Sequence, residues 1–160
     1  MSVGAREQIF SALISELKKI TTTAGYNFTI RNVYDPSVAI DAMNEFPSVN
    51  IQDGSEDCAN AETAAHLRVG GNEPILENAF TVQLDCILSV MNNPRQERNK
   101  MLADIQKHFG INHTIGNTAL TCVYAGSEPW GIHETKPLTG ITVLLKIWYR
   151  QRLELPGILK

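Results

Sequence analysis

One stretch of alternating residues constrains the fold of this chain more than any other. An apolar side chain stands at every second position in it: Phe80, Val82, Leu84, Cys86, Leu88 and Val90. A period of two is that of a β-strand with one buried face, and branched and aromatic residues fit such a pleated, half-buried surface. The sequence therefore predicts a long strand over Phe80–Val90 that lies in the core.

A helix is predicted directly after this strand. Asn93 is a residue type that caps helices, Pro94 suits the first helical position, and Gln96 stands where a capping box places an amide. Gly110 is placed to end the helix. The apolar residues between them recur at helical spacing: Met101, Leu102, Ile105 and Phe109.

The remaining patterns predict a second amphipathic helix and further strands. The helix covers Ala5–Ile20, with Glu16 on its polar face. The predicted strands are Tyr26–Tyr34, an edge or entry strand Pro47–Gln52, Thr118–Ala125, and Leu138–Arg150 with a bulge at Gly140. Two helices on one face of about five strands give a two-layer α+β fold with a mixed, mostly antiparallel sheet. The residues expected to share its core are Phe80, Val82, Leu84, Leu102, Ile105, Val143, Leu145 and Ile147.

The chain of 160 residues is of a size that suits one domain over 1–160. Residues 52–78 are acidic and rich in glycine, and they are predicted to form a long loop that orders against another protein. The tail, 152–160, carries apolar residues that either fold back on the domain or pack on a neighbouring subunit.

Charge and cysteine usage exclude some classes of protein. The net charge of −3 gives no global basic field that would recruit nucleic acid. The basic residues of the second helix alternate with acidic ones, which favours a solvated face, although a ring of such helices can line a pore through which DNA passes. Three cysteines, an odd number, favour reduced thiols, and no apolar stretch is long enough to span a membrane.

No catalytic, metal or cofactor site is predicted. The four histidines, at positions 66, 108, 113 and 133, lack the spacing of a structural zinc site, and the chain has no CxxC motif. No nucleophile elbow is present, and Cys58 is the one thiol expected to be exposed. Alanine at Cys58 or at the histidines 66, 113 and 133 should therefore leave the function intact.

Several features spread over nearly the full length carry a resemblance to a known family. They are the N-terminal helix with Arg6-Glu7-Gln8-Ile9-Phe10, the strand Phe46–Ile51, the strand Phe80–Val90, the Asn-Pro helix start followed by Met101–Ile105, and the closing strand Gly140–Arg150. Together they resemble the tail terminator, or tail completion, proteins of long-tailed bacteriophages.

The resemblance implies a non-enzymatic virion protein without cofactors. Such proteins form a homohexameric ring on the last ring of the tail tube protein and stop its polymerisation. The ring offers a joining surface to the head–tail connector or neck protein, and in contractile tails it also meets the sheath protein. DNA passes through its lumen. The protein would be assembled in the cytoplasm of a host bacterium and would lie at the head-proximal end of the tail.

Contacts between subunits are predicted for acidic, basic and apolar residues. These are Asp53, Glu56 and Asp57, with Arg95 and Arg98 as partners across a subunit boundary, and Leu153, Leu155 and Ile158 of the tail. Three alternatives remain: another head–tail connector or neck protein, a small cytoplasmic enzyme, and a monomeric module whose acidic loop captures a cation or a basic peptide. Native mass separates a ring from a monomer, and an enzyme needs a pocket with convergent polar groups.

Overall fold

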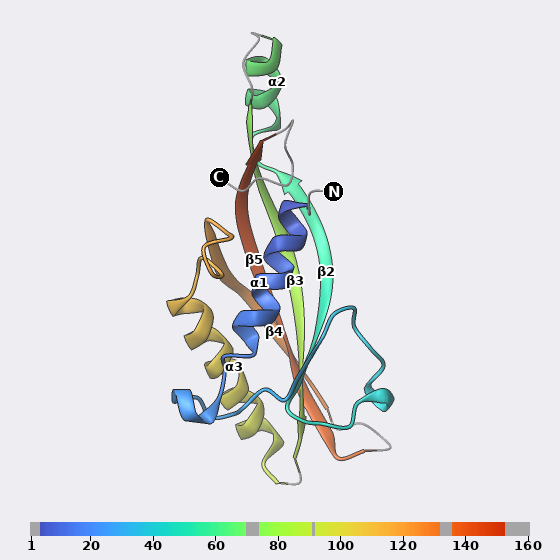
Figure 1. The fold of residues 1–160 in the computed structure, drawn as a ribbon. Helices are drawn as coiled ribbons and strands as arrows, with labels where there is room; N and C mark the ends of the chain where they lie inside the picture. The colour runs from blue at the N-terminus through green and yellow to red at the C-terminus, as the bar shows by residue number, and fades with distance from the viewer. Residues whose placement is uncertain (1–3, 70–73, 91, 132–135, 153–160) are drawn as a thin grey trace.

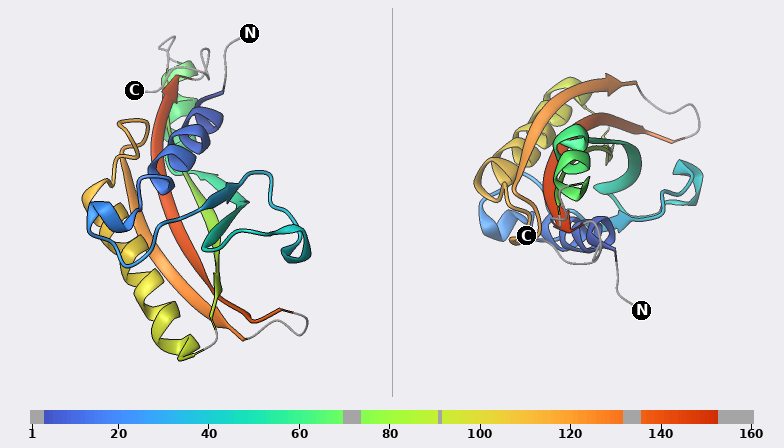
Figure 2. Two further views of the ribbon diagram at one scale, coloured as in Figure 1. Left: turned by 60° about the horizontal axis from the view of Figure 1, so that its bottom comes forward. Right: turned by 90° about the horizontal axis from the view of Figure 1, so that it is seen from above.

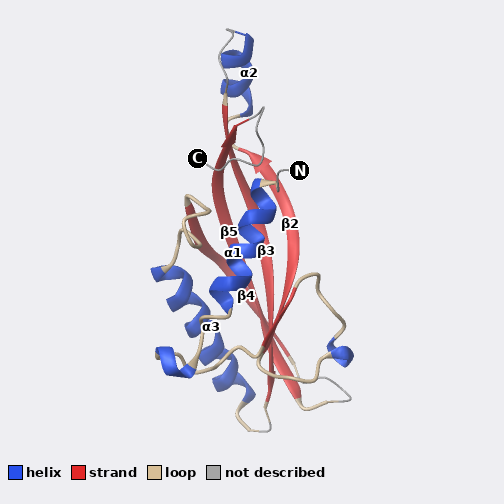
Figure 3. Ribbon diagram, viewed as in Figure 1, coloured by secondary structure: helices blue, strands red, loops and turns tan. Residues whose placement is uncertain are grey.

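The computed structural model describes residues 4–69, 74–90, 92–131 and 136–152. Its elements are α1 (Ala5–Leu17), β1 (Asn32–Tyr34), β2 (Ser48–Cys58), α2 (Ala61–Val69), β3 (Ile75–Ser89), α3 (Pro94–Ile111), β4 (Thr121–Trp130) and β5 (Leu138–Arg152), with short 3-10 turns at Thr22–Ala24 and Ile40–Ala42 (Figures 1 and 3). The five strands form one sheet in the order β1-β2-β3-β5-β4. β1 and β2 are parallel, and the other neighbouring strands are antiparallel. The predicted α+β class with a mixed, mostly antiparallel sheet is confirmed.

β3 is the middle strand of the sheet and supplies the centre of the core. It pairs with β5 along its whole length and with β2 from Asn78 to Ile87. Its alternate residues from Phe80 to Leu88 are buried in one cluster with α1 and α3. Of the predicted core, Leu102 is only partly buried. The others are at most 1% exposed: Phe80, Val82, Leu84, Ile105, Val143, Leu145 and Ile147.

α1 and α3 share that hydrophobic cluster and cover the same face of the sheet (Figures 1 and 2). α1 ends at Leu17 rather than Ile20, because the next residues form turn bonds, such as that from the Ile20 amide to the Leu17 carbonyl. α3 begins at Pro94 as predicted, but Asn93 has a φ of 52° and its side chain caps no amide. Gly110 does not end α3, which continues to Ile111.

A smaller cluster lies on the opposite face. Met43, Ile87 and Leu138 are buried there against partly buried neighbours, and the segment between β1 and β2 covers them on the opposite side of the molecule from α3 (Figure 2). In the half of this face towards α2, most of the paired residues of β3 and β5 are only half-buried. We call this half the open face; its half-buried side chains are Thr81, Gln83, Leu144, Lys146 and Trp148.

The predicted long loop over 52–78 is wrong. β2 continues to Cys58, α2 follows it, and β3 begins at Ile75, so the described part of this range consists of two strand ends in the sheet and a helix, α2, that projects from the body (Figure 1). We call residues 52–78 the arm. The Asn60 side chain closes its end: its Nδ2 donates to the Ile75 carbonyl at 2.8 Å, and its Oδ1 accepts from the Glu77 amide at 2.8 Å.

Three predicted strands need correction. Of Tyr26–Tyr34, only Asn32–Tyr34 forms a strand, because the preceding residues bind α3 instead. Of the two alternatives for Pro47–Gln52, the edge is wrong over Ser48–Asn50, since β1 pairs with β2 there, and Pro47 instead stands directly before the strand. β4 covers Thr121–Trp130, so it begins three residues after the predicted start at Thr118 and continues beyond the predicted end at Ala125. The last strand matches its prediction and continues to Arg152.

Candidate assembly surfaces

Most of the described residues of the arm are exposed to solvent. All residues of β2 from Gln52 to Cys58 are exposed, in contrast to Ser48–Ile51, which are buried. In α2, Ala64 alone is buried among the residues whose side chains are described. The strands of the arm lie in the sheet, where β3 also pairs with β5 up to Arg152, whereas α2 projects beyond it and gains little stability from burial. Such a projection offers surface for another protein.

The acidic residues at the root of the arm are already bound within the chain. Arg6 of α1 forms ion pairs with Asp53 and with Glu56, the latter at 2.9 Å between Nη1 and Oε2. It also donates to the Gly54 carbonyl at 2.7 Å, and its guanidinium lies 4.6 Å from the centroid of the Phe80 ring. Asp57 is exposed on β2.

Tyr149 completes this cluster from β5. Its hydroxyl donates to Glu56, at 3.0 Å to Oε1, and its ring meets Phe80 edge to face. Burial, together with the nearby Glu56 charge, raises the pKa of Tyr149 to about 12. The phenol therefore stays protonated near neutral pH and remains a donor to the carboxylate.

The two predicted basic partners lie at the far end of the molecule. Arg95 and Arg98 line a groove of about 860 Å³ at the start of α3, whereas the arm projects from the other end (Figure 1). Arg98 donates to the Trp130 carbonyl and to Thr139 Oγ1, both at 2.9 Å. Arg95 is exposed. The structure thus brings the two arginines together, but Arg98 is occupied within its own chain.

The sheet has two edges that pair with no strand in the described residues. β4 pairs only with β5. On the other side, β1 covers only Ser48–Asn50, so Ile51–Cys58 of β2 form the second edge. Such edges present backbone N–H and C=O groups to other chains. Each edge contains one bulge, between Asp53 and Glu56 and between Tyr124 and Gly126.

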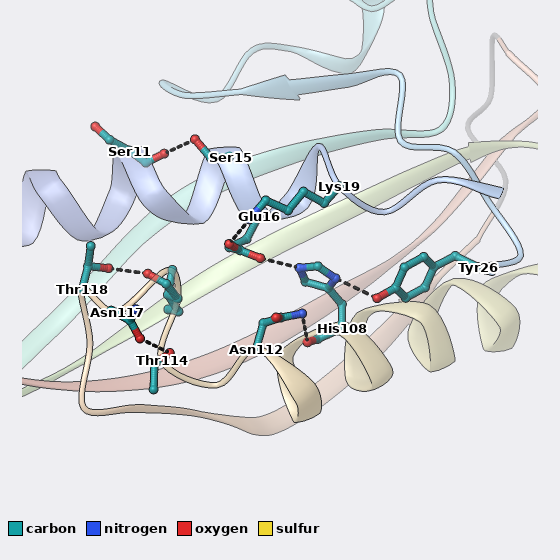
Figure 4. Close-up of polar contacts among 11 residues, drawn as sticks. Ser11, Ser15, Glu16, Lys19, Tyr26, His108, Asn112, Thr114, Asn117 and Thr118 are labelled. Atoms are coloured by element: carbon teal, nitrogen blue, oxygen red, sulfur yellow. Dashed lines mark hydrogen bonds and ion pairs between the residues drawn. The ribbon is translucent and has the colours of Figure 1, made fainter. Parts of the chain in front are cut away.

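A buried polar network between the helices was not predicted. Glu16 of α1 and His108 of α3 are 4% and 2% exposed, and His108 Nε2 lies 3.0 Å from Glu16 Oε2 (Figure 4). The other ring nitrogen of His108 lies 2.9 Å from the Tyr26 hydroxyl. Glu16 is therefore not on the polar face, as the helical pattern had suggested. The available signal was a charged residue between two core positions, Leu13 and Leu17.

The electrostatics of this network favour a neutral imidazole beside a carboxylate. Burial lowers the pKa of His108 and outweighs the opposing effect of Glu16. Burial alone would raise the pKa of Glu16, but hydrogen bonds with Lys19 and His108 lower it. Neutral His108 then donates a hydrogen bond from Nε2 to Glu16 and accepts one at Nδ1 from the Tyr26 hydroxyl. Asp104 adds a second link between α3 and the segment after α1, since it accepts from the amides of Asn27 and Phe28, both at 3.0 Å.

The described residues contain no group of three or more histidine, cysteine or acidic side chains arranged to hold a metal ion. Cys58, His66 and His113 are exposed, and Cys86 and Cys122 are buried free thiols. No helix in the described part of the chain is long and apolar enough to cross a membrane. Four residues named in the sequence predictions lie outside the described residues: His133, Leu153, Leu155 and Ile158.

Comparison with models of known protein families gives no match, and comparison with curated proteins gives none either.

Proposed function

We propose that this protein is a structural virion protein that assembles as a ring on the end of a phage tail tube, stops its polymerisation and provides the surface for head joining. The observation that carries the proposal is the pair of unpaired sheet edges on opposite sides of the domain. Two different edges that meet between copies make a head-to-tail contact, and repetition of such a contact closes a ring when the rotation permits.

Two further features support assembly. In the arm, α2 projects from the body, and Gln52–Cys58 of β2 are exposed. The groove at the start of α3 is open to solvent and lined by basic and amide side chains such as Arg95, Arg98 and Asn99, rather than enclosed like a typical ligand site. The resemblance to tail terminators, which covers nearly the full length of the sequence, favours a ring on a phage tail tube as the kind of assembly.

The decisive experiment polymerises the purified tail tube protein with and without this protein. We expect this protein to have the native mass of a multimer, to bind tube ends in electron micrographs, and to limit tube length. A neck protein would bind a finished tail without limiting the length of a growing tube, so that result would favour the alternative. A monomer with no effect on tubes would exclude both assemblies.

A further inference from the structure

The two free edges of the sheet lie level with one another across the domain. Thr121 of β4 pairs with Trp148 of β5, Trp148 pairs with Ala79 of β3, and Ala79 pairs with Asp57 of β2. These residues form one row across the sheet. Residues in one row of an antiparallel sheet have their side chains on the same face.

The direction of the strands makes these edges compatible. Each neighbouring pair from β2 through β3 and β5 to β4 is antiparallel, so β2 and β5 run one way and β3 and β4 run the other. A second copy rotated about an axis parallel to the strands places its β2 beside β4 of the first copy in opposite direction. The junction then repeats the antiparallel pattern found within each copy.

The two bulges also lie at nearly the same level. The bulge of β2 stands opposite Thr81, and that of β4 stands between the partners Leu145 and Leu144. Thr81 pairs with Lys146, the neighbour of Leu145, so the bulges are within about one row of each other. A bulge bends its strand and increases local twist. Both outer strands therefore bend at one height, as a sheet that closes on itself requires.

The contacts of Arg6 show which parts of the two sheet edges remain available for pairing with another copy. The Gly54 carbonyl in the β2 bulge accepts from Arg6 of its own chain. Beyond this bulge, Asp57 and Cys58 are exposed, and Val123 on the other edge is 48% exposed. The available segments are thus Glu56–Cys58 on one edge and Thr121–Val123 on the other.

We propose that the second copy pairs edge to edge with the first: Thr121–Val123 of β4 forms an antiparallel ladder with Glu56–Cys58 of β2 in the neighbouring copy, with Thr121 opposite Asp57. The inference rests on the proposed ring and specifies its subunit contact. It replaces the predicted contact between the arm's acidic residues and the arginines of α3, because backbone groups rather than charges make the junction.

A disulfide test can read this register directly. The protein carries Asp57→Cys and Thr121→Cys together with Cys58→Ser, which removes the exposed native thiol. The two remaining native thiols are protected, since burial raises the pKa of Cys122 to about 12 and also raises that of Cys86. The matched control carries Asp57→Cys and Glu128→Cys in the same background. Glu128 pairs with Thr142 on β5, roughly 20 Å further along β4 than Thr121 at the usual rise per residue.

Under mild oxidation, we expect the first variant to form a series of covalently linked multimers, seen as increased mass under denaturing conditions and reversed by a reductant. The control should form no covalent links and keep the denatured mass of one chain. Native mass and the thermal unfolding midpoint are measured on both variants before oxidation. If both variants form rings but the first makes no covalent multimers, or if both cross-link equally, the proposed register is overturned while the ring stands. If the parent protein is monomeric in native mass, the strand pairing and the proposed ring are both overturned.

Discussion

The indole ring of Trp130 lies directly over the backbone of Gly140. A Cβ atom built at Gly140 would stand 2.0 Å from Cζ2 of Trp130 and 2.6 Å from the Cys86 carbonyl oxygen. Gly140 and Trp130 are paired residues on β5 and β4, and the β3–β5 ladder continues through Gly140 without a shift. The bulge predicted at Gly140 is therefore wrong, and the glycine is needed for the close approach of Trp130.

We expect Gly140→Ala to lower the free energy of unfolding by about 1–3 kcal/mol, because the indole or the sheet backbone must shift. The matched control is Gly110→Ala. Apart from its chain neighbours and the backbone of its own helix, no atom lies within 4 Å of a Cβ at Gly110, and alanine is favoured over glycine inside a helix by roughly 0.5–1 kcal/mol. Urea denaturation should thus show opposite shifts of the midpoint for the two variants. A shift in the same direction for both would contradict the steric account.

Leu84→Ala tests the position of β3 in the core. Leu84 is 0% exposed, and its row contains Ile51 and Val143. The substitution should cost about 2–5 kcal/mol in the free energy of unfolding, through lost burial and the cavity that remains. Leu144→Ala removes the same atoms from the half-buried open face and should cost much less. Equal costs would show that the two faces of the sheet are buried alike.

The sequence predicts those parts of the fold whose burial repeats with a fixed period. β3 and β5 each bury every second residue, and α1 and α3 each bury one stripe, so their positions follow from the local pattern. The arm has no such pattern, because Gln52–Cys58 are exposed on both faces. Its strands are specified by the ladder with β3, a contact that no local period reveals.

The contacts at the candidate surfaces cannot be predicted from local sequence patterns either, because they join residues that are far apart in the chain. Arg6 meets Asp53 and Glu56 across more than 40 positions of sequence, and His108 meets Glu16 across 92. The sequence predicts that Asp53, Glu56 and Asp57 meet Arg95 and Arg98 across a subunit boundary, whereas within the chain Asp53 and Glu56 pair with Arg6. Only the three-dimensional arrangement decides which of several arginines is near enough.

The network of Glu16 and His108 predicts a loss of stability in acid. The pKa of His108 is lowered in the folded protein, so the unfolded chain binds a proton first as the pH falls below the ordinary value of about 6.5. Stability contributed by the neutral imidazole is thus present above that pH and decreases below it. The pKa of Glu16 is lowered too, so its contribution is present above its ordinary value of 4.5 and is lost at lower pH.

His108→Gln should flatten the first part of this dependence. Glutamine keeps polar groups at the site but does not titrate. We expect the free energy of unfolding of the parent protein to fall between about pH 7.5 and pH 5.5, with a smaller slope in the variant, whatever its overall loss of stability. Urea titrations at several pH values measure both slopes, and equal slopes would mean that His108 is not the titrating group.

Arg6→Lys should loosen the root of the arm although the charge is kept. One planar guanidinium binds Asp53, Glu56 and the Gly54 carbonyl together and stacks on Phe80, whereas an ammonium group has neither this fork nor its flat face. We expect a cost of about 1.5–3 kcal/mol in the free energy of unfolding, the range for hydrogen bonds to charged groups. Amide hydrogen exchange over Asp53–Cys58 should become faster, because Arg6 is what ties this edge to α1.

The matched control for this variant is Arg95→Lys. Arg95 is exposed at the start of α3, so its replacement should change the free energy of unfolding by no more than about 0.5 kcal/mol and leave exchange in the arm unaltered. If Arg6→Lys left the exchange of Asp53–Cys58 as slow as in the parent protein, the ladder with β3 and the bond from Tyr149 to Glu56 would be enough to hold this segment. Faster exchange in the Arg6 variant only would establish Arg6 as the link through which α1 fixes the direction of the arm.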